Sequence, residues 1–129
     1  NVWTLINNEP ELFGATFMLL NSGIDKGKIL HQIRAKIKKN DSPHDVGNRL
    51  IKDLPKVLIK IIENYKIDKK YPIHNFQYKK EKYYITKDFT PRACKKLYSN
   101  FRNNMINKYL KNKLILEKKI KIAVCKEFV

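Results

Sequence analysis

The first third of the chain has the polar and apolar pattern of a two-stranded hairpin. Residues 14–20 (GATFMLL) form an apolar run of strand length. In residues 29–38 the apolar positions recur at every second residue, as in a strand with one buried face. Residues 21–27 (NSGIDKG) lie between the two runs and are rich in turn-forming types. The pattern predicts an antiparallel hairpin, preceded by the last turns of a helix over residues 2–8.

A helical pattern follows the hairpin. Ser42, Pro43 and Asp45 have the spacing of a helix start, in which serine caps, proline takes the first position and the acid completes a capping box. Apolar residues then recur at intervals of three and four as far as Tyr65 and predict one buried stripe that covers a face of the sheet. Pro55 lies inside this stripe. Because an interior proline costs about 3 kcal/mol, we expect a kink or a break into two helices there.

The second half has weaker patterns. A basic linker over residues 66–71 precedes Pro72, and we divide the chain there into domains 1–66 and 67–129. Residues 82–86 (KYYIT) have the composition of a strand. Thr90 and Pro91 start a helix whose apolar positions repeat at every fourth residue as far as Met105. Residues 119–129 alternate like a final strand, which could also be the first strand of a further domain.

The net charge says more about possible partners than the overall composition does. Hydrophobic residues make up 43% of the 129 residues, enough for a core, and no apolar run approaches the roughly 20 residues that cross a bilayer. The net charge is +16, of which residues 66–129 carry +13. Such a half could neutralise nucleic-acid phosphates, but scattered lysines are also typical of a solvated helix face, and both interpretations stay open. We expect a cytoplasmic protein without membrane contact.

Four ordered segments resemble the folate-dependent formyltransferases. These segments are Trp3–Glu9, Phe13–Thr16, Gly23–Gly27, and the strand with Ile29 and Gln32. The family pattern is a Trp-led helix ending in Asn-Gly-Glu, a Gly-Val-Thr strand, and a Gly-Ile-Asp-Thr-Gly loop before a strand that carries Gln. Three positions depart from it, namely Asn8, Ala15 and Lys26.

The resemblance implies an α/β fold, part of a Rossmann-like domain with a mixed sheet, a hairpin at its end, a flanking helix and a small α/β tail. It implies formyl transfer from N10-formyltetrahydrofolate to an amine. Asp25 matches the catalytic acid, and Ser22, Gly23, Ile24 and Asp25 match the loop whose backbone contacts the cofactor's pterin ring. From spacing alone, Asp25 between two glycines is also an ordinary turn residue. Thr16 matches a threonine near the site or is simply a strand residue.

The family's other catalytic residues, an Asn and a His, precede the Trp-led helix and have no counterpart in these 129 residues. We therefore expect the chain to be the C-terminal part of a longer enzyme and to be inactive alone. Exposed strand edges and apolar faces would then favour a homodimer or aggregation.

The acceptor amine has two candidates within this class. Asp88–Pro91 and Lys96–Phe101 resemble a tail of the sugar-type members, which favours a nucleotide-linked amino sugar. The basic tail alone supports initiator methionyl-tRNA. An inactive fragment or paralogue that acts as a binding module is the alternative from another class.

The remaining polar residues carry no separate chemistry in the sequence. His31 lies on a predicted strand, where a core or surface role is the ordinary one, while His44 falls at a helix start and His74 in a predicted loop. Neither these histidines nor Cys94 and Cys125 have metal-ligand spacing, so we expect no metal site and two reduced thiols.

Overall fold

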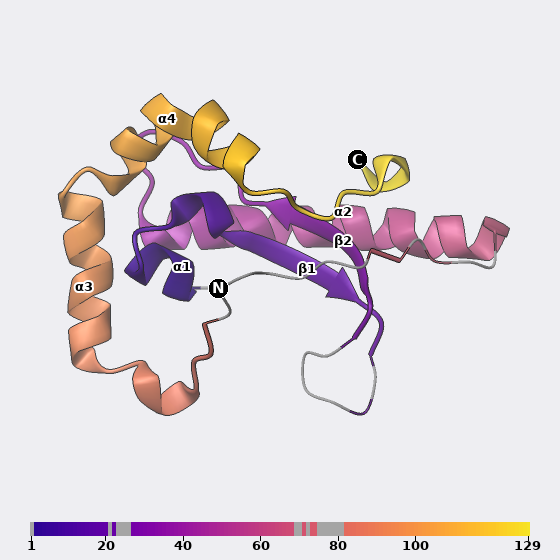
Figure 1. Ribbon diagram of the computed structural model, residues 1–129, viewed down its shortest axis with the longest axis horizontal. Helices are drawn as coiled ribbons and strands as arrows, with labels where there is room; N and C mark the ends of the chain where they lie inside the picture. Colours follow the sequence, from indigo (N-terminus) through magenta and orange to yellow (C-terminus); the bar gives the residue numbers. More distant parts are fainter. Residues whose placement is uncertain (1, 21, 23–26, 69–70, 72, 75–81) are drawn as a thin grey trace.

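A computed structural model of the chain shows a two-stranded hairpin that packs on one long helix, with two shorter helices at one end (Figure 1). The structure describes residues 2–20, 22, 27–68, 71, 73–74 and 82–129. Within these ranges the α-helices are α1 (Val2–Ile6), α2 (Pro43–Asp68), α3 (Pro91–Arg102) and α4 (Met105–Lys119), and the strands are β1 (Gly14–Met18) and β2 (Ile29–Arg34). Short 3₁₀ turns are η1 (Pro10–Leu12), η2 (Thr86–Asp88) and η3 (Lys126–Phe128). The chain therefore combines helices and strands, as expected.

The hairpin is antiparallel, which confirms the prediction from the alternating pattern. Ala15 faces Ile33 and Thr16 faces Gln32 across the two strands, with an irregularity between Phe17 and Met18. Both strands are shorter than expected, since β1 ends at Met18 and β2 at Arg34. No parallel strand occurs among the described residues, so the sheet is a hairpin there and not a mixed sheet.

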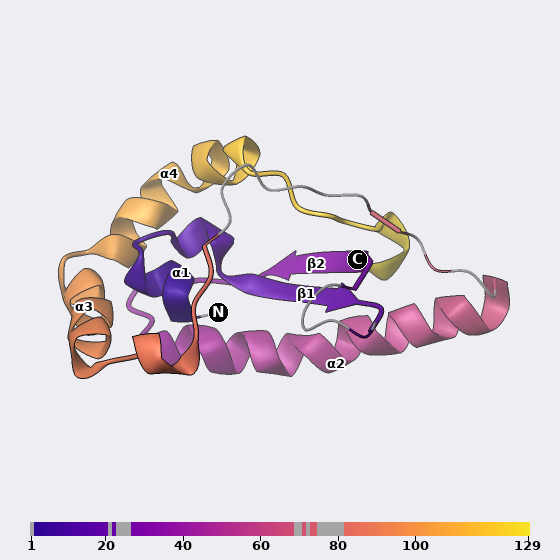
Figure 2. The same ribbon diagram turned by 60° about the horizontal axis from the view of Figure 1, so that its bottom comes forward.

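Helix α2 lies along one face of the hairpin, and α4 with the chain after it lies on the other side (Figure 2). The start of α2 has the predicted capping box. The amide of Asp45 donates to Oγ of Ser42, and the amide of Ser42 donates to the Asp45 carboxylate at 2.9 Å. The helix runs through Pro55 as one element, so the expected alternative of two helices is wrong. Val46 and Leu50 before Pro55, and Ile61 after it, are all buried. Burial on both sides of the proline offsets the lost backbone hydrogen bond.

Two hydrophobic clusters hold these elements together. The larger cluster joins buried residues of α1, the hairpin, α2, α3 and α4, among them Leu5, Val46, Leu97 and Tyr109. The smaller one contains Leu30, Ile61, Cys125 and Phe128. Both clusters include residues from either side of position 66, while the division into domains 1–66 and 67–129 itself stays a prediction.

The tail differs from the expected order of strand, helix and strand. Residues 82–85 are irregular and run into η2, so the strand predicted over 82–86 is wrong. Asn104 has a φ of 61° and ends the predicted single helix, which the structure divides into α3 and α4. Residues 119–129 end α4 and then form an irregular segment and η3 instead of a strand. The Thr90 cap is confirmed, since its hydroxyl accepts from the amide of Ala93.

Candidate functional site

The base of the hairpin loop is closely packed. The amide of Leu19 donates to the carbonyl of Lys28 at 3.0 Å. A Cβ added to Gly27 would lie 1.6 Å from the carbonyl oxygen of Leu19, so only glycine fits there. Ser22 is exposed, whereas Gly23, Ile24, Asp25 and Lys26 lie outside the described residues. The predicted catalytic and cofactor-binding roles of Ser22, Gly23, Ile24 and Asp25 therefore remain predictions.

Thr16 and Gln32 form a hydrogen-bonded pair across the two strands. Nε2 of Gln32 donates to Oγ1 of Thr16 at 3.0 Å, and Oε1 of Gln32 accepts from the amide of Ala123 at 2.9 Å. The Ala123 amide can only donate, so it requires the amide oxygen of Gln32 on its side and turns the NH₂ group toward Thr16. Two residues that carry the sequence resemblance thus meet on one face of the hairpin.

A pocket of about 260 Å³ lies beside this pair. Its walls come from η1, both strands and Ile122 of the C-terminal segment. Gly14 lines the pocket. A Cβ at this position would lie 2.0 Å from the carbonyl oxygen of Ile33, so only glycine fits there. The pocket is small for a drug-sized ligand on the usual scale of about 300–1,000 Å³, but it exposes the hydroxyl of Thr16 to solvent.

Arg34 also lines this pocket, and sequence reasoning did not single it out. Its guanidinium donates to the carbonyl oxygens of Glu11 at 3.0 Å, Glu117 at 3.3 Å, and Ile120. These bonds join the strand to η1 and to the end of α4. The signal in the sequence was a cation on a strand face between apolar residues, which needs buried acceptors for its five donors.

Segments of the predicted tail hold α1, which carries the Trp-led part of the resemblance. The ring of Trp3 stacks on that of Tyr84 with centroids 4.1 Å apart and an angle of 5°, and Phe89 packs edge-on against the same indole. Nδ2 of Asn100 donates to the carbonyl oxygens of Leu5 at 2.8 Å and Ile6 at 3.0 Å. These bonds satisfy carbonyls at the C-terminus of α1, which have no partner within the helix.

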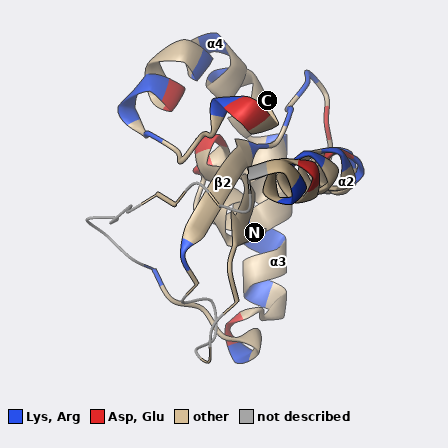
Figure 3. Cartoon of the chain, turned by 90° about the vertical axis from the view of Figure 1, so that its right-hand side faces the viewer, with Lys and Arg blue, Asp and Glu red and all other residues tan. Residues whose placement is uncertain are grey.

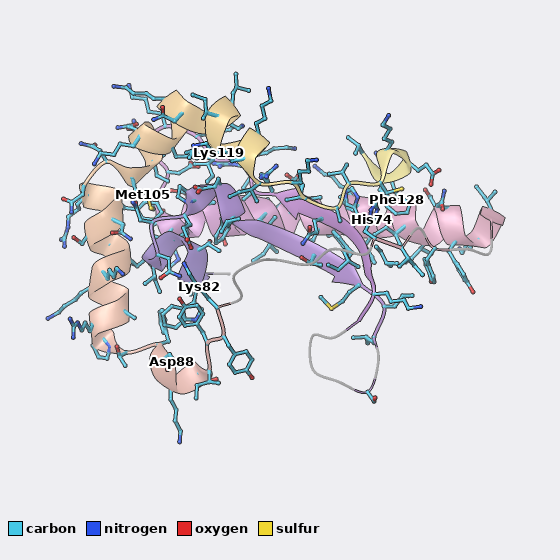
Figure 4. The ribbon with its side chains drawn as sticks, viewed as in Figure 1. His74, Lys82, Asp88, Met105, Lys119 and Phe128 are labelled. Carbon is cyan, nitrogen blue, oxygen red and sulfur yellow. The ribbon has the colours of Figure 1, made fainter. Side chains whose placement is uncertain are left out.

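Asn8 and Glu9 come shortly after the end of α1. Asn8 has a φ of 62°, a conformation that glycine adopts freely and asparagine tolerates better than most residues. The resembling family has glycine at this position, and Asn8 takes a backbone conformation that glycine also adopts. Lys82 reaches back to Glu9, with Nζ 2.8 Å from a carboxylate oxygen, and it lies beside α1 together with η2 (Figure 4).

The three histidines do not form a site. His31 is 1% exposed, and its Nδ1 accepts from the amide of Cys125 at 3.0 Å, which leaves the proton on Nε2. Burial, with a contribution from nearby His74, lowers the pKa of His31 below its ordinary value. His31 is thus a core histidine. His44 lies at the start of α2 with Nε2 3.2 Å from the hydroxyl of Tyr98.

The thiols of Cys94 and Cys125 and the hydroxyl of Tyr109 lie outside the hairpin. Cys94 and Cys125 are free, and burial raises the pKa of the Cys125 thiol. Burial first, and then the hydrogen bond to Glu117, raises the pKa of the Tyr109 hydroxyl. No group of three metal-ligating side chains occurs in the described part of the chain, and none of its helices is long and apolar enough to cross a membrane.

Comparisons with protein-family models, with curated proteins and with solved structures find no match for this chain. Within the described residues, the candidate site consists of the Thr16–Gln32 pair on the hairpin and the pocket beside it.

Proposed function

We propose that this chain is the C-terminal part of a folate-dependent formyltransferase, in which the hairpin extends the sheet of a Rossmann-like domain. The observation that carries the proposal is the hydrogen-bonded pair of Thr16 and Gln32 beside a pocket, on the hairpin whose loop includes Ser22 and Asp25. The positive φ of Asn8, where the resembling family has glycine, supports the same assignment. The acid, the loop glycines and the polar pair belong to one short supersecondary unit.

In the proposed reaction N10-formyltetrahydrofolate would supply a formyl group to an amine: the new amide C–N bond would form, the bond between the formyl carbon and N10 would break, and tetrahydrofolate would leave with a proton on N10. Donors from an Asn and a protonated His would stabilise the negative charge that develops on the formyl oxygen. Asp25 keeps the His charged, because a carboxylate within about 4–6 Å raises an imidazole pKa, and it helps to move protons. Residues 22–25 match the loop whose backbone contacts the pterin ring in the resembling family, and they would hold that ring here. The Asn and His come from polypeptide that precedes residue 1 in the complete enzyme.

The proposed acceptor is a nucleotide-linked amino sugar, on the basis of the tail. Asn100 belongs to the segment that resembles sugar-type members, and its two hydrogen bonds join α3 to α1. The tail therefore supports the Trp-led helix by direct contact, which gives its sequence pattern a structural reason.

The experiment compares two proteins, the 129-residue chain and the product of its gene extended upstream of Asn1. Each is assayed with N10-formyltetrahydrofolate and either a nucleotide-linked amino sugar or methionyl-tRNA. We expect formyl transfer to the amino sugar by the longer protein only. Transfer to methionyl-tRNA instead would change the acceptor, and no transfer to either amine would refute the assignment to formyltransferases. Turnover by the 129-residue chain would show that the upstream residues are not required.

A further inference from the structure

A wide hollow lies between α4 and the segment that connects β2 to α2. Its volume is about 640 Å³, and its walls are Lys39, Asn104, Asn107, Lys108, Leu110 and Lys111. Three of these six residues are cations, two are amides and none is an acid. Lys108 and Lys111 lie on α4 and Lys39 lies on the connection between β2 and α2, and Figure 3 shows several basic positions along α4. The hollow therefore has a strongly positive potential.

A second hollow continues the first along α3. It has a volume of about 420 Å³ and shares Asn104 and Asn107 with the first, so the two hollows adjoin there, and together they are called the groove. Its wall adds a further cation, Arg102, and two aromatic side chains, Tyr98 and Phe101. Tyr98 is 41% exposed, which leaves part of its ring open to a ligand.

The one acid in the groove is already neutralised. Both oxygens of Asp41 accept from the guanidinium of Arg49, at 2.7 and 2.8 Å. This hydrogen bond lowers the pKa of Asp41, and the pair carries no net charge toward a ligand. Asp41 is the one carboxylate among the wall residues, so Lys39, Arg102, Lys108 and Lys111 line the groove without a further acid to oppose them.

Helix α4 starts where the two hollows meet. Its first flanking residue, Asn104, makes no side-chain capping bond to the helix and instead has Oδ1 3.4 Å from Nδ2 of Asn107. The partial positive charge of a helix N-terminus therefore adds to the lysines at the centre of the groove. This contribution supplements the four cations and would be weak without them.

We propose that this groove binds single-stranded nucleic acid. The lysines and Arg102 neutralise successive phosphates, and a base stacks on the exposed ring of Tyr98. Two joined hollows suit a polymer better than a single phosphate group. An unpaired strand is favoured over a duplex because only unstacked bases offer a free face to a tyrosine ring. The groove is separate from the hairpin site, so this binding does not depend on formyl transfer.

The test uses the full 129-residue chain and a fluorescein-labelled 12-nucleotide strand, as oligo(dT) and as oligo(rU), in anisotropy titrations over several salt concentrations. The groove variant combines Lys39→Gln, Lys108→Gln and Lys111→Gln. The matched control combines Lys52→Gln, Lys60→Gln and Lys66→Gln, which removes the same charge from exposed positions on α2. We expect the groove variant to weaken binding at least about tenfold and to reduce the slope of log K against log salt by about 2, because each lost phosphate contact contributes about 0.7. The control should stay within about twofold of wild type.

A second pair of variants tests stacking. Tyr98→Leu removes the ring and should weaken binding at least about fivefold, whereas Tyr98→Phe keeps the ring and should bind like wild type. Far-UV circular dichroism and Tm establish that each variant is folded, and Lys111→Gln alone gives the salt-slope test if the triple variant does not fold. Equal losses in the groove variant and its control, equal affinity for a 12-base-pair duplex, or no binding by the wild-type chain would each overturn the proposal.

Discussion

The side chain of Gln32 joins two segments that are far apart in the sequence: it donates to the hydroxyl of Thr16 on β1 and accepts from the amide of Ala123 near the C-terminus. The backbone of Gln32 also donates to the carbonyl of Ala123 at 2.6 Å. One residue of β2 therefore fixes both the cross-strand pair of the candidate site and the course of the chain after α4.

Substitution of Gln32 should reveal how much this connection stabilises the fold. Gln32→Leu leaves the amide of the buried Ala123 without its side-chain acceptor, and we expect a loss of about 1–3 kcal/mol in unfolding free energy. Thr16→Val removes only the exposed cross-strand bond and should cost less than about 1 kcal/mol. Urea unfolding followed by circular dichroism measures both. Equal effects of the two substitutions would mean that the bond to Ala123 adds no stability.

Asp25 is the residue on which the proposed chemistry depends. In the longer enzyme that we propose, Asp25→Asn should lower kcat at least about 100-fold, the scale of losing a positioned proton-transfer group. Glu63→Gln removes the same charge from an exposed position on α2 and serves as the control, with an expected kcat close to wild type. Steady-state kinetics at saturating cofactor measure both. A wild-type rate for Asp25→Asn would mean that Asp25 is only a turn residue and takes no part in the reaction.

The stack of Tyr84 on Trp3 gives the chain a built-in spectroscopic probe, because Trp3 is its only tryptophan. Tyr84→Leu should change the near-UV circular dichroism of Trp3 and cost about 0.5–1.5 kcal/mol beyond the loss of buried area. Tyr83→Leu is the control, since Tyr83 is 87% exposed and should leave both the spectrum and the stability unchanged. A spectrum unaffected by Tyr84→Leu would contradict the stacked arrangement.

His31 should titrate below its ordinary pKa of 6.5, since burial disfavours the imidazolium. The unfolded chain then binds a proton that the folded chain does not, so His31 contributes stability above pH 6.5 that is lost as the pH falls below it. Nitrogen NMR of the histidine ring should show that His31 is mainly neutral at pH 6.5, with its proton on Nε2, consistent with Nδ1 accepting from Cys125. An imidazole that is at least half protonated at pH 6.5 would refute this assignment.

The pair of Asp41 and Arg49 should produce a second, more acidic transition. The hydrogen bond from Arg49 lowers the pKa of Asp41 in the folded chain. The pair's contribution to the free energy of unfolding is therefore complete above the pKa of the unfolded chain, about 3.9, and disappears as the pH falls through the lower pKa of the folded chain. The difference in unfolding free energy between wild type and Asp41→Asn should therefore be at least about 1 kcal/mol at pH 7 and should shrink toward pH 2. A difference independent of pH would show that the Asp41 charge is not involved.

Local rules accounted for the elements whose signals lie within a few residues of each other. The Ser42–Asp45 capping box, the Thr90 cap and the hairpin of alternating residues all formed as predicted, because each depends on neighbouring backbone groups and on a short periodic pattern. The candidate groove was harder to predict from the sequence. The sequence indicated a basic second half, but only the turn at Asn104 brings α4 opposite Lys39.

The amino-acid sequence alone determined the hairpin, the helix starts, the excess of positive charge and the ordered residues that resemble a formyltransferase. Tertiary packing decided the rest. Residues 82–86 have strand composition, but in the structure the ring of Tyr84 stacks on Trp3 and no strand forms there. In the C-terminal segment, Ala123 bonds to Gln32 and the predicted final strand does not form. Helix α2 passes Pro55 because buried residues on both sides of the proline, Val46 and Leu50 before it and Ile61 after it, offset one lost hydrogen bond. Each of these outcomes depends on contacts between residues distant in the chain, which composition and periodicity do not encode.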